Sequence, residues 1–334
     1  MSRSRLSLAL SDGGLALPAG APVAVFAPRA GMDLTALPRA HCDLITGFRP
    51  DADALEAAGW TTRLTPRAGV DYGAAVAVLP RAKARARALI AQAARVVRGG
   101  LLVIDGQKTD GIDSILREVR KRGPILGSFS KAHGKTIWLT ADADVFADWA
   151  SAGPEPVEGG HVTAPGVFSA DGVDPASALL ADALPERLGA HVVDAGAGWG
   201  YLARRMLVQC SGVERLDLVE ADHDALECAR LNVQDPRAAF HWADATRWRP
   251  DTACDAVVMN PPFHTGRAAD ADLGRAFIAA AAMMLAPHGQ LWMVANRHLP
   301  YEAALSARFA RTAELSGDAR FKVLWAARPY RKAR

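Results

Sequence analysis

The sequence predicts an α/β fold built from two tandem, doubly wound domains, and three observations lead to this prediction. The chain has 334 residues, which exceeds the length of one ordinary domain. Short apolar runs alternate along it with helical stretches of about 10–15 residues, a pattern typical of parallel sheets covered by helices on both faces. The two halves also repeat the same order of elements, on either side of a stretch rich in Gly and Pro.

In the first half, short apolar runs predict buried strands and longer helical patterns predict the helices between them. The expected strands cover 22–28, 74–80, 99–106 and 135–140, and the expected helices cover 81–97 and 111–123.

The second half resumes the alternation and matches the first. Its expected strands cover 191–196, 215–221, 238–244, 255–260, 289–295 and 321–327. Residues 94–119 and 283–308 each contain a helix end, a Gly turn, a strand, a loop and a further helix, and each half then closes with a Trp-containing strand. Before these segments, residues 75–83 of the first half correspond in position to residues 256–264 of the second half. We infer an internal duplication.

The Gly- and Pro-rich segment 151–160 predicts a linker between the two copies. We therefore expect a first domain over 1–150, a linker over 151–165 and a second domain over 166–334.

Composition excludes several classes of protein. Half of the residues are apolar and 22% are charged, which excludes general disorder. No run approaches the ~18 apolar residues of a membrane span, and the apolar run near the N-terminus is too short for a signal peptide. The four scattered cysteines form no CxxC pair, so we expect reduced thiols in a cytoplasmic protein without disulfides or a zinc site.

Charge is divided unevenly between the halves. Residues 1–150 carry 20 Lys and Arg against 14 Asp and Glu, whereas the remainder carries 19 against 22. A basic first half could hold a polyanion while the second half performs chemistry, although ordinary surface variation gives the same balance.

A glycine-rich turn between a strand and a helix marks the second half. Gly196, Gly198 and Gly200 permit a tight turn and close approach of the backbone to a ligand, and the helix after them offers free N–H groups. Asp194, just before the first glycine, suits a ligand with a positive amino group better than a diphosphate.

Two further acids end the next two strands. Glu220 occupies the place at which a carboxylate accepts hydrogen bonds from ribose hydroxyls, and Asp244 could accept from an adenine amino group. With Asp194, they predict a nucleoside crevice at the carboxyl ends of three strands.

The strand over 255–260 ends in Asn260, Pro261, Pro262 and Phe263. The two prolines remove backbone donors and leave carbonyl groups available, the Asn260 side chain adds an acceptor, and Phe263 adds a flat face. Acceptors beside an aromatic ring fit a planar substrate that carries an exocyclic NH2 group.

Together, DAGAGWG at 194–200, Glu220, Asp244 and NPPFH at 260–264 resemble the class I S-adenosylmethionine-dependent methyltransferases that methylate amino groups. More closely, the chain resembles the bacterial 16S rRNA guanine-N2 methyltransferases and their 23S relatives, also across residues 166–180. The resemblance implies two tandem Rossmann-like methyltransferase domains, of which the N-terminal one is degenerate and serves RNA binding or structural support.

The resemblance also implies methyl transfer from S-adenosylmethionine to N2 of a guanine in rRNA, most closely 16S rRNA. Composition predicts a cytoplasmic protein that needs neither metal nor membrane, and the internal duplication favours a monomer, because one chain already contains a paired arrangement. The implied catalytic residues are Asn260, Pro261, Pro262 and Phe263. The implied cofactor-binding residues are Asp194, Gly196, Gly198, Gly200, Glu220, Asp244 and Asn260. The partner would be ribosomal RNA or a ribosomal subunit.

Other acceptors and one other class remain open at this point. A 23S rRNA guanine, a release-factor glutamine or a DNA adenine would use related motifs, although Phe263 and the degenerate first copy favour rRNA guanine. A non-catalytic RNA-binding assembly factor would keep the fold without needing an intact Asn260-Pro261-Pro262-Phe263 segment.

Overall fold

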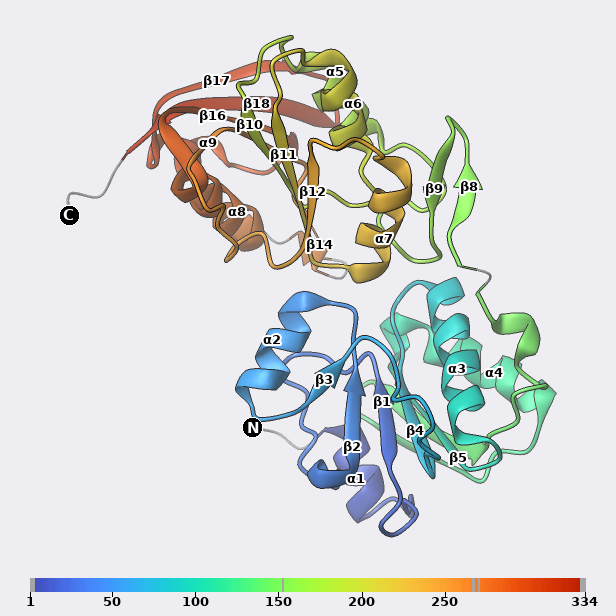
Figure 1. The fold of residues 1–334 in the computed structure, drawn as a ribbon. Helices are drawn as coiled ribbons and strands as arrows, with labels where there is room; N and C mark the ends of the chain where they lie inside the picture. The colour runs from blue at the N-terminus through green and yellow to red at the C-terminus, as the bar shows by residue number, and fades with distance from the viewer. Residues whose placement is uncertain (1–3, 152, 263, 266–267, 270, 331–334) are drawn as a thin grey trace. The chain divides into compact units, whose positions relative to one another are not determined.

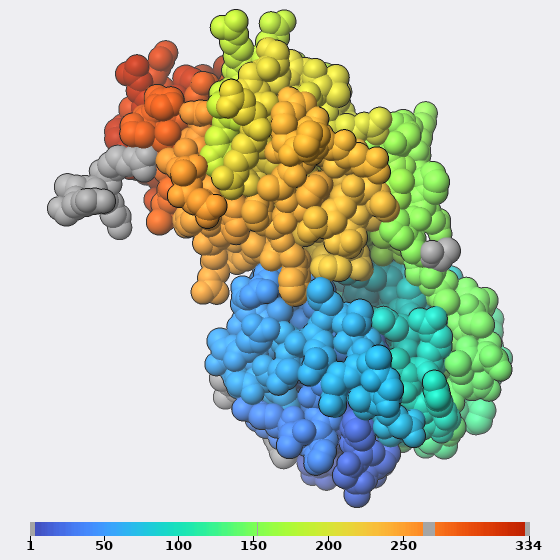
Figure 2. All heavy atoms as spheres, viewed as in Figure 1, coloured from blue at the N-terminus to red at the C-terminus, as the bar shows by residue number. Residues whose placement is uncertain are grey.

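The computed structural model describes residues 4–151, 153–262, 264–265, 268–269 and 271–330. The chain divides into two compact units, Met1–Gly153 and Pro154–Arg334, which are described separately (Figure 1). Figure 2 draws the heavy atoms of both units as spheres, and each unit has its own hydrophobic core.

The first unit contains a seven-stranded sheet in the order β3-β2-β1-β4-β5-β7-β6, in which β7 alone runs antiparallel to the other strands. Its strands are β1 (Val23–Phe26), β2 (Cys42–Ile45), β3 (Thr62–Arg63), β4 (Ala74–Val78), β5 (Leu101–Gln107), β6 (Gly127–Lys131) and β7 (Gly134–Thr140). Its helices are α1 (Arg5–Ser11), α2 (Arg49–Ala57), α3 (Lys83–Val97) and α4 (Ile112–Arg122), with short 3-10 turns η1 (Arg39–His41), η2 (Lys108–Asp110) and η3 (Ala147–Trp149).

Helices cover both faces of this sheet, as the continuous apolar strands require. Apolar side chains of α3 and α4 pack on one face, and those of α1 and α2 pack on the other. β4 shows why: all five of its residues are buried, so neither of its faces can meet water.

The second unit repeats this topology with the order β12-β11-β10-β13-β16-β18-β17. Its strands are β10 (His191–Ala195), β11 (Arg215–Glu220), β12 (Ala238–Trp242), β13 (Cys254–Met259), β16 (Leu285–Asn296), β17 (Phe309–Gly317) and β18 (Phe321–Pro329). Its helices are α5 (Pro175–Ala183), α6 (Tyr201–Gln209), α7 (His223–Asn232), α8 (Ala271–Met284) and α9 (Glu302–Ser306). Two small hairpins pair β8 (Glu155–Val157) with β9 (His161–Thr163) and β14 (His264–Thr265) with β15 (Ala268–Ala269).

In the second unit α5, α6 and α7 cover one face of the sheet, whereas α8 and α9 cover the other. The closing strands of the two units also correspond in register: Trp138 of β7 lies opposite Val103, and Trp325 of β18 lies opposite Trp292. The α/β fold class and its repeated strand order are confirmed.

The strands that the sequence pattern missed are short or lie at sheet edges. β2 lies inside the sheet but has only four residues, one of them Asp43, and β3 has only two. β6 and β17 are the last strands of their sheets, with mostly exposed or half-buried residues. Edge strands carry no continuous apolar run, so periodicity does not reveal them.

The segment 151–165, expected to be a linker, contains the β8–β9 hairpin. Val162 and Asn232 of α7 are joined by two hydrogen bonds of 2.7 Å, and His161 is buried. These contacts attach the segment to the second unit, which composition alone did not reveal.

Candidate active site

The turn after β10 has a backbone path that only glycine adopts without strain. Gly196, Gly198 and Gly200 have φ angles of 81°, 55° and 90°. A Cβ atom on Gly200 would also lie 2.9 Å from the Val233 side chain. Gly200 caps α6 without a side-chain hydrogen bond, so the first N–H groups of this helix remain available to a ligand.

Asp194 lies beneath this turn, on β10. Its side chain is fully buried, and neither carboxylate oxygen has a hydrogen-bond partner among the described residues. Burial, with a smaller contribution from the charge of Glu220, raises the pKa of Asp194 from 3.8 to about 8, although the backbone N–H of Ala203 in α6 lowers it slightly. A buried carboxylate without a partner is costly, and a ligand that brings a positive charge or an N–H donor would relieve this cost.

Glu220 ends β11 and fastens the glycine turn. Its two carboxylate oxygens accept hydrogen bonds from the backbone N–H groups of Gly198, at 2.7 Å, and Asp222, at 2.8 Å. Burial outweighs these bonds and raises the pKa of Glu220. Glu220 therefore stands at the predicted strand end and also orders the backbone that would meet a ligand.

Asp244 follows β12, the neighbouring strand. One of its oxygens accepts from the Thr246 backbone N–H at 2.8 Å and from the Thr246 hydroxyl at 2.6 Å. The order β12-β11-β10 thus places Asp244, Glu220 and Asp194 on three adjacent strands, at or near their carboxyl ends.

Asn260 follows β13, on the other side of β10. Its amide nitrogen donates to Asp174 Oδ2 at 2.9 Å and to Ser177 Oγ at 2.8 Å. A cavity at this point is lined by Asn260, Asp174, Ser177, Phe168, Trp199 and the glycine turn, among others. The structure therefore brings Asn260 and the glycine turn to one cavity, whereas Asp194, Glu220 and Asp244 are not among its described lining residues.

The rest of the predicted catalytic segment is only partly described. Pro261 is buried and Pro262 is exposed, whereas Phe263 lies outside the described residues. The four cysteines are all free and buried. Within the described part of the chain, no group of three or more His, Cys, Asp or Glu side chains could hold a metal ion, and no helix is long and apolar enough to cross a membrane.

Sequence reasoning did not find Asp174 and Ser177. The signal was present, because Asp174 followed by Pro175 and then Ser177 is a helix start, with an N-cap residue and Pro at the first helical position. This pattern indicated only the start of a helix and did not predict the contact with Asn260. Trp199, which lies between Gly198 and Gly200, is buried, and its indole N–H donates to the Phe168 carbonyl at 3.1 Å.

At the corresponding corner, the first unit has the same backbone path as the second unit but lacks the acidic side chains. The N–H of Ala27 donates to Ile45 O at 2.7 Å, just as Gly196 donates to Val219 O at 2.8 Å, and Ala27 has the glycine-like φ of 51°. Strand register places Val25 and Thr46 where the second unit has Asp194 and Glu220.

The counterpart of Asn260 needs a correction of one residue. The expected alignment of 75–83 with 256–264 pairs Leu79 with Asn260. However, the strand register gives a different correspondence. Val76 pairs with Val103 in the first unit, and Val258 pairs with Trp292 in the second. Val103 and Trp292 correspond because each lies opposite the Trp of its closing strand. Val78 therefore stands at the place of Asn260.

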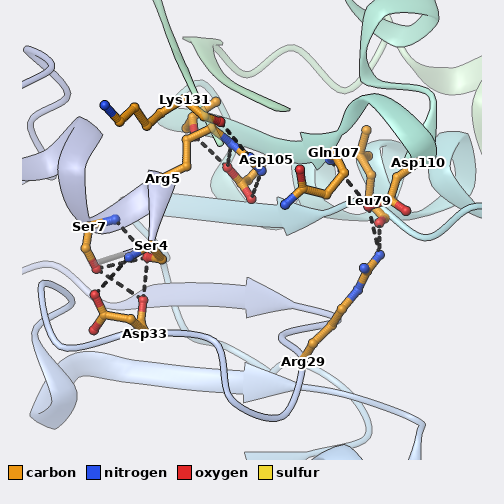
Figure 3. Close-up of polar contacts among 11 residues, drawn as sticks. Ser4, Arg5, Ser7, Arg29, Asp33, Leu79, Asp105, Gln107, Asp110 and Lys131 are labelled. Carbon is orange, nitrogen blue, oxygen red and sulfur yellow. Dashed lines mark hydrogen bonds and ion pairs between the residues drawn. The ribbon is translucent and has the colours of Figure 1, made fainter. Parts of the chain in front are cut away.

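Ion pairs occupy the strand ends of the first unit (Figure 3). Arg5 of α1 is almost fully buried and makes two hydrogen bonds, of 2.9 and 2.8 Å, to the carboxylate of Asp105 on β5. Arg29 donates to the Leu79 carbonyl at 2.5 Å and to Asp110 at 3.2 Å. Asp105 and Asp110 are thus paired with the chain's own arginines.

Comparison with known proteins agrees with the geometry of the second unit. Residues 159–325, half of the chain, match the family described as Methyltransferase small domain. The chain belongs to this methyltransferase family.

Relatives extend the similarity into the first unit. The chain is 30% identical over 269 residues to the ribosomal RNA small subunit methyltransferase C of Shewanella amazonensis, covering 75% of this chain and 76% of the relative. It is equally 30% identical over 280 residues to the ribosomal RNA large subunit methyltransferase G of Streptomyces avermitilis, covering 79% of this chain and 73% of that protein.

A solved structure is also similar over both units. The T. thermophilus 16S rRNA N2 G1207 methyltransferase, in complex with AdoMet and guanosine, has a TM-score of 0.76 and 27% identity. The match covers 94% of this chain and 90% of that protein. The family resemblance inferred from the sequence is confirmed.

The raised pKa of Asp194 predicts a particular pH dependence of stability. Between pH 4 and 8 the unfolded chain ionises Asp194 while the folded protein keeps it protonated, so the free energy of unfolding falls as pH rises. We expect Asp194→Asn to reduce this loss between pH 5 and pH 8 by at least ~1 kcal/mol, measured by urea denaturation. Asp71→Asn, at an exposed position, is the control. An unchanged pH dependence in the Asp194 variant would contradict the buried, unpaired carboxylate.

Proposed function

We propose that this protein transfers the methyl group of S-adenosylmethionine to the exocyclic N2 of a guanine in ribosomal RNA, with 16S rRNA as the favoured substrate. The observation that carries the proposal is the cavity shared by Asn260 and the glycine turn, since it puts a hydrogen-bond acceptor for an amine beside a nucleoside-binding backbone. The similarity to an enzyme solved with AdoMet and guanosine supports both ligands.

The residues present fit the cofactor. The carboxylate of Asp194 is an orphaned acceptor close to a turn whose glycines admit a ligand, and Glu220 and Asp244 stand on the adjacent strands. We assign Asp194, Gly196, Gly198, Gly200, Glu220 and Asp244 to cofactor binding, whereas Asn260, which the resemblance also placed there, acts mainly on the substrate amine. Bound there, the cofactor supplies an electrophilic methyl group on a sulfonium.

Asn260 and Pro261 would prepare the nucleophile. The guanine amine is a poor nucleophile because its lone pair is delocalised into the ring. If Asn260 Oδ1 and the Pro261 carbonyl accept its two N–H bonds, the nitrogen is held toward tetrahedral geometry with its lone pair free. When the N–C bond forms, the methylated nitrogen loses a proton to solvent, so no strong base is needed. Pro262 would shape the turn and Phe263 would stack on the base.

The first unit has another task in this proposal. Val25, Thr46 and Val78 replace the polar residues of the second unit, so we propose that it binds no cofactor and serves RNA binding and structural support. Several of its basic residues are already paired with acids, namely Lys83 and Arg87 with Glu118, Arg122 with Asp148, and Lys135 with Asp113. We further propose that the protein acts as a monomer in the cytoplasm.

A 23S rRNA guanine is the second candidate substrate, because a large-subunit relative matches this chain as well as a small-subunit one does. The Asn260-Pro261-Pro262 segment argues against a non-catalytic assembly factor, and the repeated first unit argues against a release factor as the substrate.

Modified-nucleoside mapping tests the proposal directly. We expect rRNA from cells that lack this protein to lose one N2-methylguanosine, located by mass spectrometry of rRNA fragments, and purified protein to restore it on isolated subunits or naked rRNA. Methylation confined to release factor, or rRNA with unchanged guanines, would refute the proposal.

Removal of the Asn260 side chain should separate chemistry from cofactor binding. We expect Asn260→Ala to lower kcat at least ~100-fold because it loses a polar contact to the reacting amine. The affinity for S-adenosylmethionine, measured by calorimetry, should change less than about twofold. Wild-type turnover in this variant would remove Asn260 from the mechanism.

A further inference from the structure

The amide group of Asn260 is held from one side only, by the start of α5. Asp174 is the N-cap residue of this helix, and its Oδ2 accepts both the Ser177 backbone N–H at 2.8 Å and the Asn260 amide at 2.9 Å. Ser177 Oγ accepts the second amide hydrogen at 2.8 Å. Both hydrogens of the Asn260 Nδ2 are therefore used, whereas its oxygen accepts no hydrogen bond from the residues that the structure describes.

The two partners of Asn260, Asp174 and Ser177, differ in whether they tolerate both orientations of its amide group. If the amide were turned by 180°, its oxygen would face the Asp174 carboxylate, and two acceptors would repel each other. The Ser177 hydroxyl could rotate and donate to that oxygen, so it tolerates either orientation. Asp174 alone distinguishes the two ends of the amide.

We propose that Asp174 is a positioning residue, which fixes the Asn260 amide so that its oxygen is presented to the substrate amine. This inference rests on the proposed function. Asp174, Ser177 and Asn260 line the same cavity, so the orientation is set where the substrate would bind. The wrong orientation would present a donor to the amine, which itself needs acceptors.

Substitutions at Asp174 can separate this role from helix capping. Asp174→Asn keeps a good N-cap and an oxygen that accepts both hydrogen bonds, so we expect kcat within about threefold of wild type. Asp174→Ser keeps a cap, but its hydroxyl no longer distinguishes the two ends of the amide. We expect Asp174→Ser and Asp174→Ala to lower kcat at least ~10-fold, with the KM for S-adenosylmethionine within about twofold. Equal kcat in the Ser and Asn variants would overturn the proposal.

Side-chain NMR gives a readout that does not depend on activity. The chain contains only three asparagines, Asn232, Asn260 and Asn296, so 15N-asparagine labelling gives three amide pairs, which single substitutions assign. We expect hydrogen exchange of the Asn260 pair to accelerate at least ~10-fold in Asp174→Ala and to stay slow in Asp174→Asn. The Asn232 amide, which donates to Val162 O and Trp199 O, should stay protected in all variants.

The two experiments separate the two claims. Slow exchange that depends on Asp174, in a protein that methylates no rRNA, would refute the proposed function and leave the orientation of Asn260 in place. Wild-type exchange and turnover in Asp174→Ala would refute the positioning role.

An independent observation concerns the turn between β6 and β7 in the first unit. Lys131 pairs with Gly134, and the two residues between them, Ala132 and His133, have positive φ angles of 47° and 55°. Such turns favour Asn-Gly, because other residues are strained there. Two hydrogen bonds hold this turn, from Arg5 Nη1 to Lys131 O at 3.3 Å and from Lys108 N to His133 O at 2.9 Å.

The strained turn presents basic side chains. Lys131 extends away from the Arg5–Asp105 ion pair (Figure 3). Lys108, Lys131, His133 and Lys135 line one surface pocket with Asp113, and among the described lining residues Asp113 is the acid that pairs there, with Lys135 at 2.6 Å. A rigid, electropositive pocket of this kind fits a phosphate group.

The geometry points to this turn as a contact for a backbone phosphate of the RNA substrate, an inference that also rests on the proposed function. We expect Lys108→Glu/Lys131→Glu to weaken binding of naked 16S rRNA at least ~10-fold and to lower the slope of log affinity against log salt by about 2.

Arg95→Glu/Lys121→Glu makes the same change of charge elsewhere in this unit and is the control. Arg95 precedes β5 while Lys108 follows it, and Lys121 lies in the last turn of α4, whereas Lys108 lies in η2, before that helix begins. A loss confined to the Lys108/Lys131 variant supports the contact. Equal binding by the wild type and both variants overturns it, whereas a wild type that binds no rRNA refutes the proposed function instead.

Discussion

The left-handed glycine turn after β10 is the constraint on which the second unit depends. Because Gly196, Gly198 and Gly200 all have positive φ, the chain can reverse from the strand into α6 within a few residues and leave the first N–H groups of that helix uncapped. Glu220 holds the middle of the turn through the Gly198 N–H. Every other element of the site, from Asp194 below to Asn260 across the sheet, is arranged around this backbone.

The two units show how one scaffold supports different strand-end chemistry. Their buried strands and strand orders correspond, so the packed sheet requires only that apolar runs continue on both faces. The carboxyl ends of the strands can carry either apolar or acidic residues within that packing. In the first unit these positions carry Val25, Thr46 and Val78, and the nearby Asp105 is neutralised by Arg5. The same fold is therefore stable with an unpaired carboxylate in one copy and with satisfied ion pairs in the other.

Sequence patterns predicted the site residues that a local signal marks, such as a glycine turn, a strand end or a Pro-Pro corner. The glycine spacing and the Asn260-Pro261-Pro262 corner are local signals, and the family resemblance that they carried is confirmed. The contact between Asp174 and Asn260 was beyond their reach, because the two residues are 86 positions apart and only tertiary packing brings α5 to the end of β13. The β8–β9 hairpin was missed for a related reason: its stability comes from Asn232, on another element, and not from its own composition.

Ala27 shows that this corner of the backbone does not depend on a glycine. Its left-handed backbone costs about 1–2 kcal/mol relative to glycine, yet it keeps the hydrogen bond to β2 that its counterpart Gly196 makes to β11. The path of the chain at this corner is thus dictated by the sheet and not by any bound molecule. To build a nucleoside pocket in the first unit, a designer would have to exchange side chains and remove Arg5. The main chain at this corner already follows the path that the second unit uses.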